Sequence, residues 1–79
     1  MIEINVVGHR DSGDLLRVLS VERQGVTQWV ESTGRRWVEE SGEHILVMLY
    51  GGEVLHLVYK DEADCWYLVP RGEPSMRAI

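Results

Sequence analysis

The chain lacks the usual reinforcements of a small fold. It has 79 residues and a single cysteine, Cys65, so an internal disulfide is excluded. The three histidines and this cysteine show no zinc-ligand spacing, so we expect no metal and no other cofactor. A chain of this size buries only about 60% of the surface that its unfolded form exposes, and small domains often depend on a disulfide, a metal or a partner chain. Self-association remains as a source of stability, and we expect a homodimer.

Positive charge and long apolar runs are also scarce. Acidic residues outnumber basic ones by 13 to 8, and the net charge is −5. Binding to a nucleic-acid backbone requires clustered cations, so nucleic acid is a poor candidate partner. No apolar run approaches the roughly 20 residues that cross a bilayer, and no signal peptide is recognisable. We expect a cytoplasmic protein with no membrane partner, and the lone thiol fits a reducing compartment.

Motifs of enzyme chemistry are missing as well. The sequence contains no phosphate-binding glycine loop, no G-x-S-x-G turn and no calcium-binding loop. Cys65 with His44 or His56 would offer a nucleophile and a base. The strand register expected for these residues directs Cys65 and His44 to opposite faces, however. We therefore predict a protein that is not an enzyme and has no catalytic residues.

The pattern that the sequence does contain is alternation. Residues 1–7 alternate apolar and polar side chains, which is typical of a half-buried strand. A polar segment, 8–14, is bounded by glycines and predicts a loop. Residues 15–23 fit either a short amphipathic helix or a strand, and we favour the strand because the segment has room for only about two helical turns.

From Val26 to Val69 we expect four loops, at 32–34, 40–43, 51–52 and 61–64, that join five strands. Pro70 ends the pairing because it lacks an N–H group, and 71–79 is expected to be a loose tail. The sequence thus predicts one all-β domain, 1–79, an antiparallel meander of five to seven strands curled into a small half-open barrel or roll. Pairing across the loops predicts a core built on Trp29, Trp37, Leu46, Leu57, Tyr59, Trp66 and Leu68.

The same register leaves the sheet with two apolar faces. An open meander needs only one buried face, so a partner, most simply a second copy of the chain, is expected to cover the other. This predicts a non-enzymatic protein-interaction or self-association module. We expect His56 to be partly buried and satisfied by a neighbour; the alternative is a pH-sensitive residue of the interface. The candidate interface comprises Val47, Val54, His56, Val58 and Val69.

A different function is also open at this level. The chain has three tryptophans and three tyrosines, and aromatic side chains can stack on the bases of single-stranded nucleic acid. The best place for such an accessory site is Trp37 with the adjacent Arg35 and Arg36. The excess of acidic residues makes this the alternative rather than the main hypothesis.

Three elements carry a resemblance to a known family: the segment Trp29–Trp37, the Gly51–Gly52 turn and the Trp66–Leu68 ending. Together they resemble a small bacterial family of unknown function. Its members occur free-standing and as the C-terminal module of Y-family, ImuB-like polymerase proteins. The resemblance covers roughly Val26 to Val69. It implies an accessory β-module, in a DNA-repair setting, without direct contact to DNA and without catalytic residues to carry over.

Overall fold

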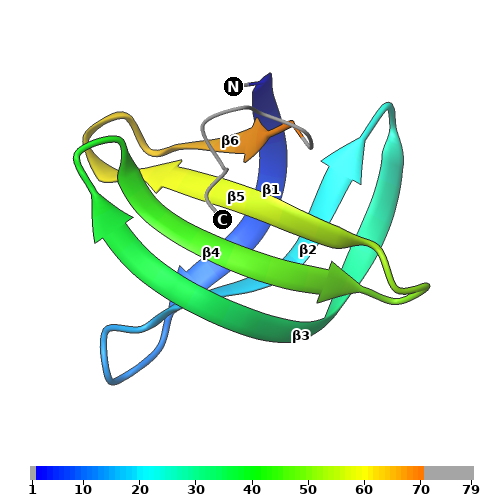
Figure 1. Cartoon of the computed structure of the whole chain (residues 1–79), viewed down its shortest axis with the longest axis horizontal. Coiled ribbons are helices and arrows are strands. Elements are labelled where there is room, and N and C mark those ends of the chain that lie inside the picture. Colours follow the sequence, from blue (N-terminus) through cyan, green and yellow to red (C-terminus); the bar gives the residue numbers. More distant parts are fainter. Residues whose placement is uncertain (1, 71–79) are drawn as a thin grey trace, which may run out of the picture.

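The structure, a computed structural model, describes residues 2–70 as a closed barrel of six antiparallel strands (Figure 1). Each strand pairs with the next in sequence, and β6 pairs with β1 to close the barrel. This confirms the predicted all-β meander; the barrel is closed rather than half-open. The predicted tail, 71–79, lies outside the described residues. The elements are β1 (Ile2–Arg10), β2 (Leu16–Arg23), β3 (Val26–Glu39), β4 (Gly42–Leu49), β5 (Val54–Lys60), η1 (Asp61–Ala63) and β6 (Cys65–Val69).

The segment that fitted both a helix and a strand is a strand, β2. Leu16 and Val18 point into the barrel, and the alternate Arg17 and Leu19 are exposed. The first loop is shorter than predicted, because Gly8 to Arg10 belong to β1 and pair with β2. A Cβ at Gly8 would lie 2.7 Å from the carbonyl oxygen of Arg17. This glycine therefore permits close strand contact rather than a turn.

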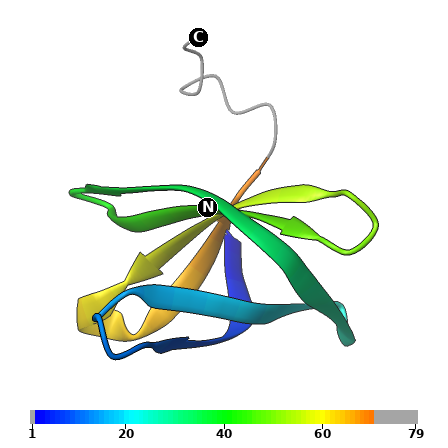
Figure 2. The same ribbon diagram turned by 90° about the horizontal axis from the view of Figure 1, so that it is seen from below.

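The largest error of the sequence analysis concerns β3. The predicted loop at 32–34 does not exist, because β3 runs unbroken for 14 residues. Gly34 is not among the described glycines with positive φ, and the register with β4 is irregular on both sides of it. Figure 2 shows the long, bent strand that results. A bulged strand absorbs extra residues by bending, so Trp29 and Trp37 lie along one strand instead of pairing across two.

The chain enters β3 through a turn that we did not predict. Gln24 and Gly25 have φ values of 52° and 78°, and Arg23 pairs with Val26 across them. Two consecutive residues with positive φ are typical of a two-residue hairpin turn.

The turn between β3 and β4 is tighter than predicted. Glu39 pairs with Gly42, and Trp37 pairs with His44, whereas the predicted loop paired Glu39 with His44. Gly42 has φ of 140°, and a Cβ there would lie 2.5 Å from the carbonyl oxygen of Tyr59. A shift of two residues keeps every side chain on its face. It does, however, bring Trp37 and His44 directly opposite each other.

The turn between β4 and β5 contains one residue more than predicted. Gly51 and Gly52 have positive φ, as expected, but the N–H of Leu49 donates to the carbonyl oxygen of Glu53. Leu46 therefore pairs with His56 instead of Leu57. A slip of one residue exchanges the two faces of a strand.

This slip reassigns the core. The interior is built from alternate residues of β2, β4 and β5, with Trp66 of β6. Four predicted core residues lie in it or against it: Leu57, Tyr59, Trp66 and Leu68. The pairs Leu57–Leu68 and Tyr59–Trp66 are confirmed. Three predicted core residues, Trp29, Trp37 and Leu46, lie outside this cluster, and Ile45, Val47 and Leu49 take their place.

Candidate interaction surface

The outer surface carries two exposed aromatic side chains on neighbouring strands. Trp29 of β3 is 60% exposed and Tyr50, which follows β4, is 68% exposed. The N–H of Tyr50 donates to the carbonyl oxygen of Trp29 at 3.1 Å, so the two residues lie next to each other. Ser20 pairs with Trp29 on one side and with Val7 on the other, and Leu19 precedes it. We call these exposed apolar residues, Val7, Leu19, Trp29 and Tyr50, the Trp29 patch.

Acidic side chains flank the Trp29 patch. Glu31 lies two positions beyond Trp29 on β3, and Glu22 of β2 pairs with Thr27, two positions before it. Thr27 and Trp29 are two apart in a regular part of the strand and share a face, which places Glu22 beside the patch. Glu31 lies at the register shift between Val30 and Ser32 and is placed on the outer surface by its exposure. Glu22 and Glu31 are both exposed, and neither side chain has a hydrogen-bond or ion-pair partner among residues 2–70. The patch is therefore an apolar surface with a negative border.

A second aromatic group lies further along β3 and is built differently. The ring of Trp37 stacks on His44 at 5.1 Å between centroids and lies 5.2 Å from His56. Its indole N–H donates to Oε2 of Glu39 at 2.9 Å. The guanidinium of Arg35 lies 5.2 Å from the centroid of the same ring. Trp37 is therefore in contact with His44, His56, Glu39 and Arg35. We call Trp37, His44 and His56 the Trp37 cluster.

The two histidines of the Trp37 cluster are hydrogen-bonded to each other. Nδ1 of His44 lies 2.8 Å from Nε2 of His56, and Nε2 of His44 lies 2.7 Å from the hydroxyl oxygen of Ser41. A neutral ring offers one donor and one acceptor, so either tautomer of His44 can complete this chain when both rings are neutral. Protonation of both rings would place two N–H groups against each other.

Burial lowers the pKa of His44 and also that of His56. The carboxylate of Glu39 opposes this for both rings, and Lys60 adds to the lowering of the pKa at His44. The pKa of His56 is lowered further by the charge of His44. Both rings thus favour the neutral form that their shared hydrogen bond requires. The expectation that His56 is partly buried and satisfied by a neighbour agrees with this geometry.

Ser41, His44 and His56 are spaced like the nucleophile, the base and the orienting group of a catalytic triad. His44 is only 6% exposed, however, and the Trp37 ring covers its face. The hydroxyl of Ser41 and both nitrogens of His44 are engaged in the hydrogen-bonded chain. Within residues 2–70, no three His, Cys, Asp or Glu side chains are grouped so that they could hold a metal ion. We interpret the cluster as a structural element.

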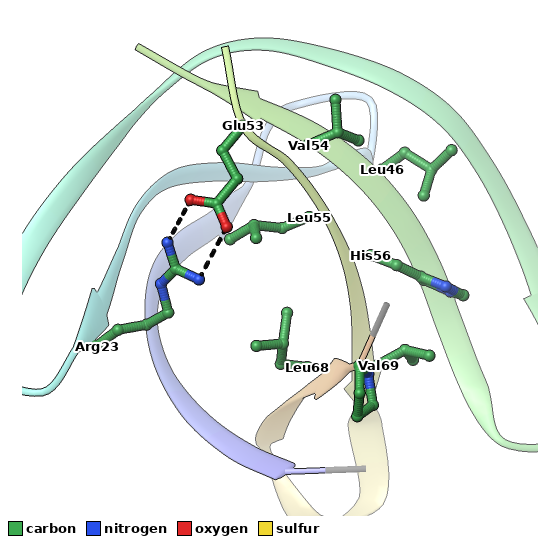
Figure 3. Close-up of a pocket in the computed structure, with 9 residues that line it drawn as sticks. Arg23, Leu46, Glu53, Val54, Leu55, His56, Leu68 and Val69 are labelled. Atoms are coloured by element: carbon green, nitrogen blue, oxygen red, sulfur yellow. Dashed lines mark hydrogen bonds and ion pairs between the residues drawn. The ribbon is translucent and has the colours of Figure 1, made fainter. Parts of the chain in front are cut away.

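A hollow of about 430 Å³ opens at one end of the barrel (Figure 3). Arg23 of β2 holds Glu53 with two hydrogen bonds, at 2.6 and 3.2 Å, and this pair forms one border. The remaining lining is mainly apolar. The residues other than this pair are Leu46, Val54, Leu55, His56, Leu68, Val69 and Pro70.

The predicted interface is divided by the structure. Val54, His56 and Val69 come together at this hollow, as Figure 3 shows. Val47 is 1% exposed and belongs to the barrel interior, so its assignment to an interface is wrong. Val58 is fully buried and offers no surface either. The one-residue slip between β4 and β5 explains why Val47 was placed on the same face as Val54.

The predicted nucleic-acid surface is not assembled as one surface. Nη1 of Arg36 donates to the carbonyl oxygen of Leu16, in contrast to Arg35, which lies over the Trp37 ring.

Cys65, the residue considered as a nucleophile, is also engaged locally. Its thiol donates to the carbonyl oxygen of Ala63 at 3.2 Å. Burial and the carboxylate of Glu3 raise the pKa of this thiol, which favours its unreactive protonated form.

The sequence analysis missed both aromatic groups as they are built. It placed Trp29 and Trp37 in the core, and it did not single out Tyr50 or Glu22. No local signal indicated that Trp37 would meet two histidines.

Comparison of this chain with protein-family models, with curated proteins and with solved structures finds no match. The resemblance to the polymerase-associated module therefore stays a prediction. In the part of the chain that the structure describes, no helix is long and apolar enough to cross a membrane.

Proposed function

We propose that this barrel is a non-enzymatic protein-interaction module that binds its partner through the Trp29 patch. The observation that carries the proposal is the pair of adjacent aromatic side chains, Trp29 and Tyr50, that are mostly exposed to solvent. Aromatic residues supply a large apolar area together with one polar atom, and they dominate the energetics of protein interfaces. Leu19 and Val7 extend the same surface over two further strands.

The aromatic side chains of the patch lie outside the core of the barrel. The core cluster and the side chains packed against it include neither Trp29 nor Tyr50. A contiguous apolar surface that the fold itself does not use marks a site of association. The exposed aromatic area of the patch therefore supports an interaction function.

The proposal is tested by selection from a random peptide library displayed on phage, with the folded barrel as the target. We expect enriched peptides whose affinity falls by about 30-fold or more for Trp29→Ser, which corresponds to a hot-spot loss of about 2 kcal/mol. Tyr50→Ser should weaken the same peptides.

Val38→Ser is the matched control. Val38 is 77% exposed on the same strand but lies at its far end, outside the Trp29 patch. Its substitution should leave peptide affinity unchanged. Peptides that bind Trp29→Ser and the unchanged chain equally well, or a selection without enrichment, would overturn the proposal. Circular dichroism confirms that each variant is folded.

A further inference from the structure

We infer that the partner of the Trp29 patch is a cationic segment of another protein, which places an apolar anchor on Trp29 and lysine or arginine side chains beside it. This inference rests on the proposed function and specifies the chemistry of its partner. The inference rests on the charges of the barrel surface, namely the acidic side chains beside the patch and the contacts of the basic side chains elsewhere.

The acids beside the patch are available. Glu22 and Glu31 lie on the two sides of Trp29, are exposed, and have no side-chain partner in the described chain. A carboxylate at the border of an apolar site attracts a cation and repels an anion, and it does so without the cost of burying a charge. Two such carboxylates at opposite sides of one aromatic ring define where the cations of a partner would lie.

The described cations, by contrast, are all engaged within the chain. Four arginines bind oxygen atoms of other residues, and one arginine and the lysine lie over aromatic rings. The pairs are Arg10 with Glu43, Arg17 with Asp11, Arg23 with Glu53, Arg36 with the carbonyl of Leu16, Arg35 with Trp37 and Lys60 with Tyr67. The unbalanced charge of the barrel surface is therefore negative, in agreement with the net charge of −5.

This balance decides between the possible occupants. A dimer with two-fold symmetry would bring the same patch of both copies together. Glu22 and Glu31 of one copy would then face the acids of the other, because the Trp29 patch and its border contain no basic residue. Nucleic acid and anionic membranes are repelled by the same charges. A cationic protein segment satisfies both the apolar centre and the acidic border.

The experiment uses the strongest Trp29-dependent peptide from the library and measures its dissociation constant by fluorescence anisotropy. We expect this peptide to contain lysine or arginine near its apolar anchor. Glu22→Gln with Glu31→Gln should weaken its binding by about 3- to 20-fold in low salt, because each exposed ion pair accounts for up to about 5-fold. The loss should shrink at about 500 mM salt, where exposed charges are screened.

The control is a second double variant with the same net charge as the Glu22→Gln and Glu31→Gln variant. Glu40→Gln with Glu62→Gln removes two exposed acids from turns outside the patch. This pair should leave the affinity within about twofold. If it weakens binding as much as the Glu22 and Glu31 pair does, the attraction is diffuse and the inference is overturned. Trp29-dependent peptides without cations would overturn it too, while leaving the proposed function intact.

Light scattering on a sizing column at two concentrations distinguishes the remaining outcome. We expect a monomer in the absence of peptide, for the unchanged chain and for Trp29→Ser. A dimer that Trp29→Ser converts to a monomer would identify a second copy as the occupant; it would support an interaction function but overturn the cationic partner. If no peptide depends on Trp29, the proposed function and the inference fail together.

Discussion

Trp29 and Trp37 lie on the same strand and on the same outer side of the barrel, yet their surroundings are opposite. Trp37 is half-buried against two histidines and donates its N–H to Glu39. Trp29 is 60% exposed and borders another exposed aromatic residue. The difference shows that the residues of the neighbouring strand decide whether a tryptophan ring is covered or left exposed. Opposite Trp37 this strand supplies His44, and opposite Trp29 it supplies the end of β4 and Tyr50.

The comparison separates stability from recognition. A side chain that is covered by its own fold stabilises the fold, and one that is left uncovered is available to a partner. We therefore expect substitutions in the Trp37 cluster to change the free energy of unfolding. Substitutions in the Trp29 patch should change binding and leave stability nearly unchanged.

The largest expected effect comes from Trp37→Ala. We predict a loss of about 2–4 kcal/mol in the free energy of unfolding, because the ring leaves a gap over His44 and two ring contacts disappear. Trp29→Ala should cost less than about 1 kcal/mol, since it removes an exposed side chain. Urea unfolding, followed by circular dichroism, measures both. Equal losses for the two variants would remove the distinction between the two tryptophans.

The second prediction concerns the pH dependence of the free energy of unfolding, which we attribute to the Trp37 cluster. The pKa of each clustered histidine is lower in the folded state than in the unfolded state, so unfolding takes up protons as the pH falls. Stability from this source is fully present above the unfolded pKa of about 6.5 and is lost as the pH falls through the folded pKa. The loss should reach about 1.4 kcal/mol per pH unit for each proton taken up.

Urea unfolding at a series of pH values between about 7.5 and 5 measures this dependence. His56→Gln should flatten the curve in this range, because it removes one of the two titrating rings of the cluster. His9→Gln is the control, since His9 is exposed and lies outside the cluster. A His56→Gln variant that keeps the full slope would contradict the assignment of the pH dependence to the cluster.

The smallest expected effect comes from Glu39→Gln. The carboxylate of Glu39 raises the pKa of His44 and that of His56 against the larger effect of burial. Its neutralisation should therefore lower both pKa values further, while the amide oxygen still accepts the hydrogen bond from Trp37. Titration of the two histidines by NMR measures the change. Glu40→Gln, at the adjacent exposed acid, should change the pKa values of the two histidines less, because Glu40 is not among the groups that shift either pKa.

Much of the fold could be predicted from local patterns. Alternation identified β1, the short length of segment 15–23 favoured a strand there, and Gly51 and Gly52 adopt the expected positive φ. The pairing of β5 with β6 was correct because the turn between them fixed it. The register of β4 against β5 was wrong because hairpin turns of two and three residues can use the same glycines. Because the turn between β4 and β5 contains one residue more than predicted, the inner and outer faces of these strands were exchanged relative to each other.

The candidate site was much less accessible to sequence reasoning. Val54, His56 and Val69 were placed together correctly, but Val47 and Val58 were not exposed, and Trp29 was assigned to the core. A tryptophan in an alternating segment fits a core and an interface equally well. Its role became visible only when β3 proved continuous and the neighbours of each ring were known.

The sequence by itself determined that this protein is an all-β meander, since alternation and turn residues act over a few neighbouring positions. It also determined the excess of acidic over basic residues, 13 against 8. Only the tertiary structure decided which face of each strand points inward, that β1 meets β6, and that Trp29 stays exposed while Trp37 is covered. The physical reason is that bulges and turn lengths set the register, and the register is stabilised by contacts between residues far apart in the chain.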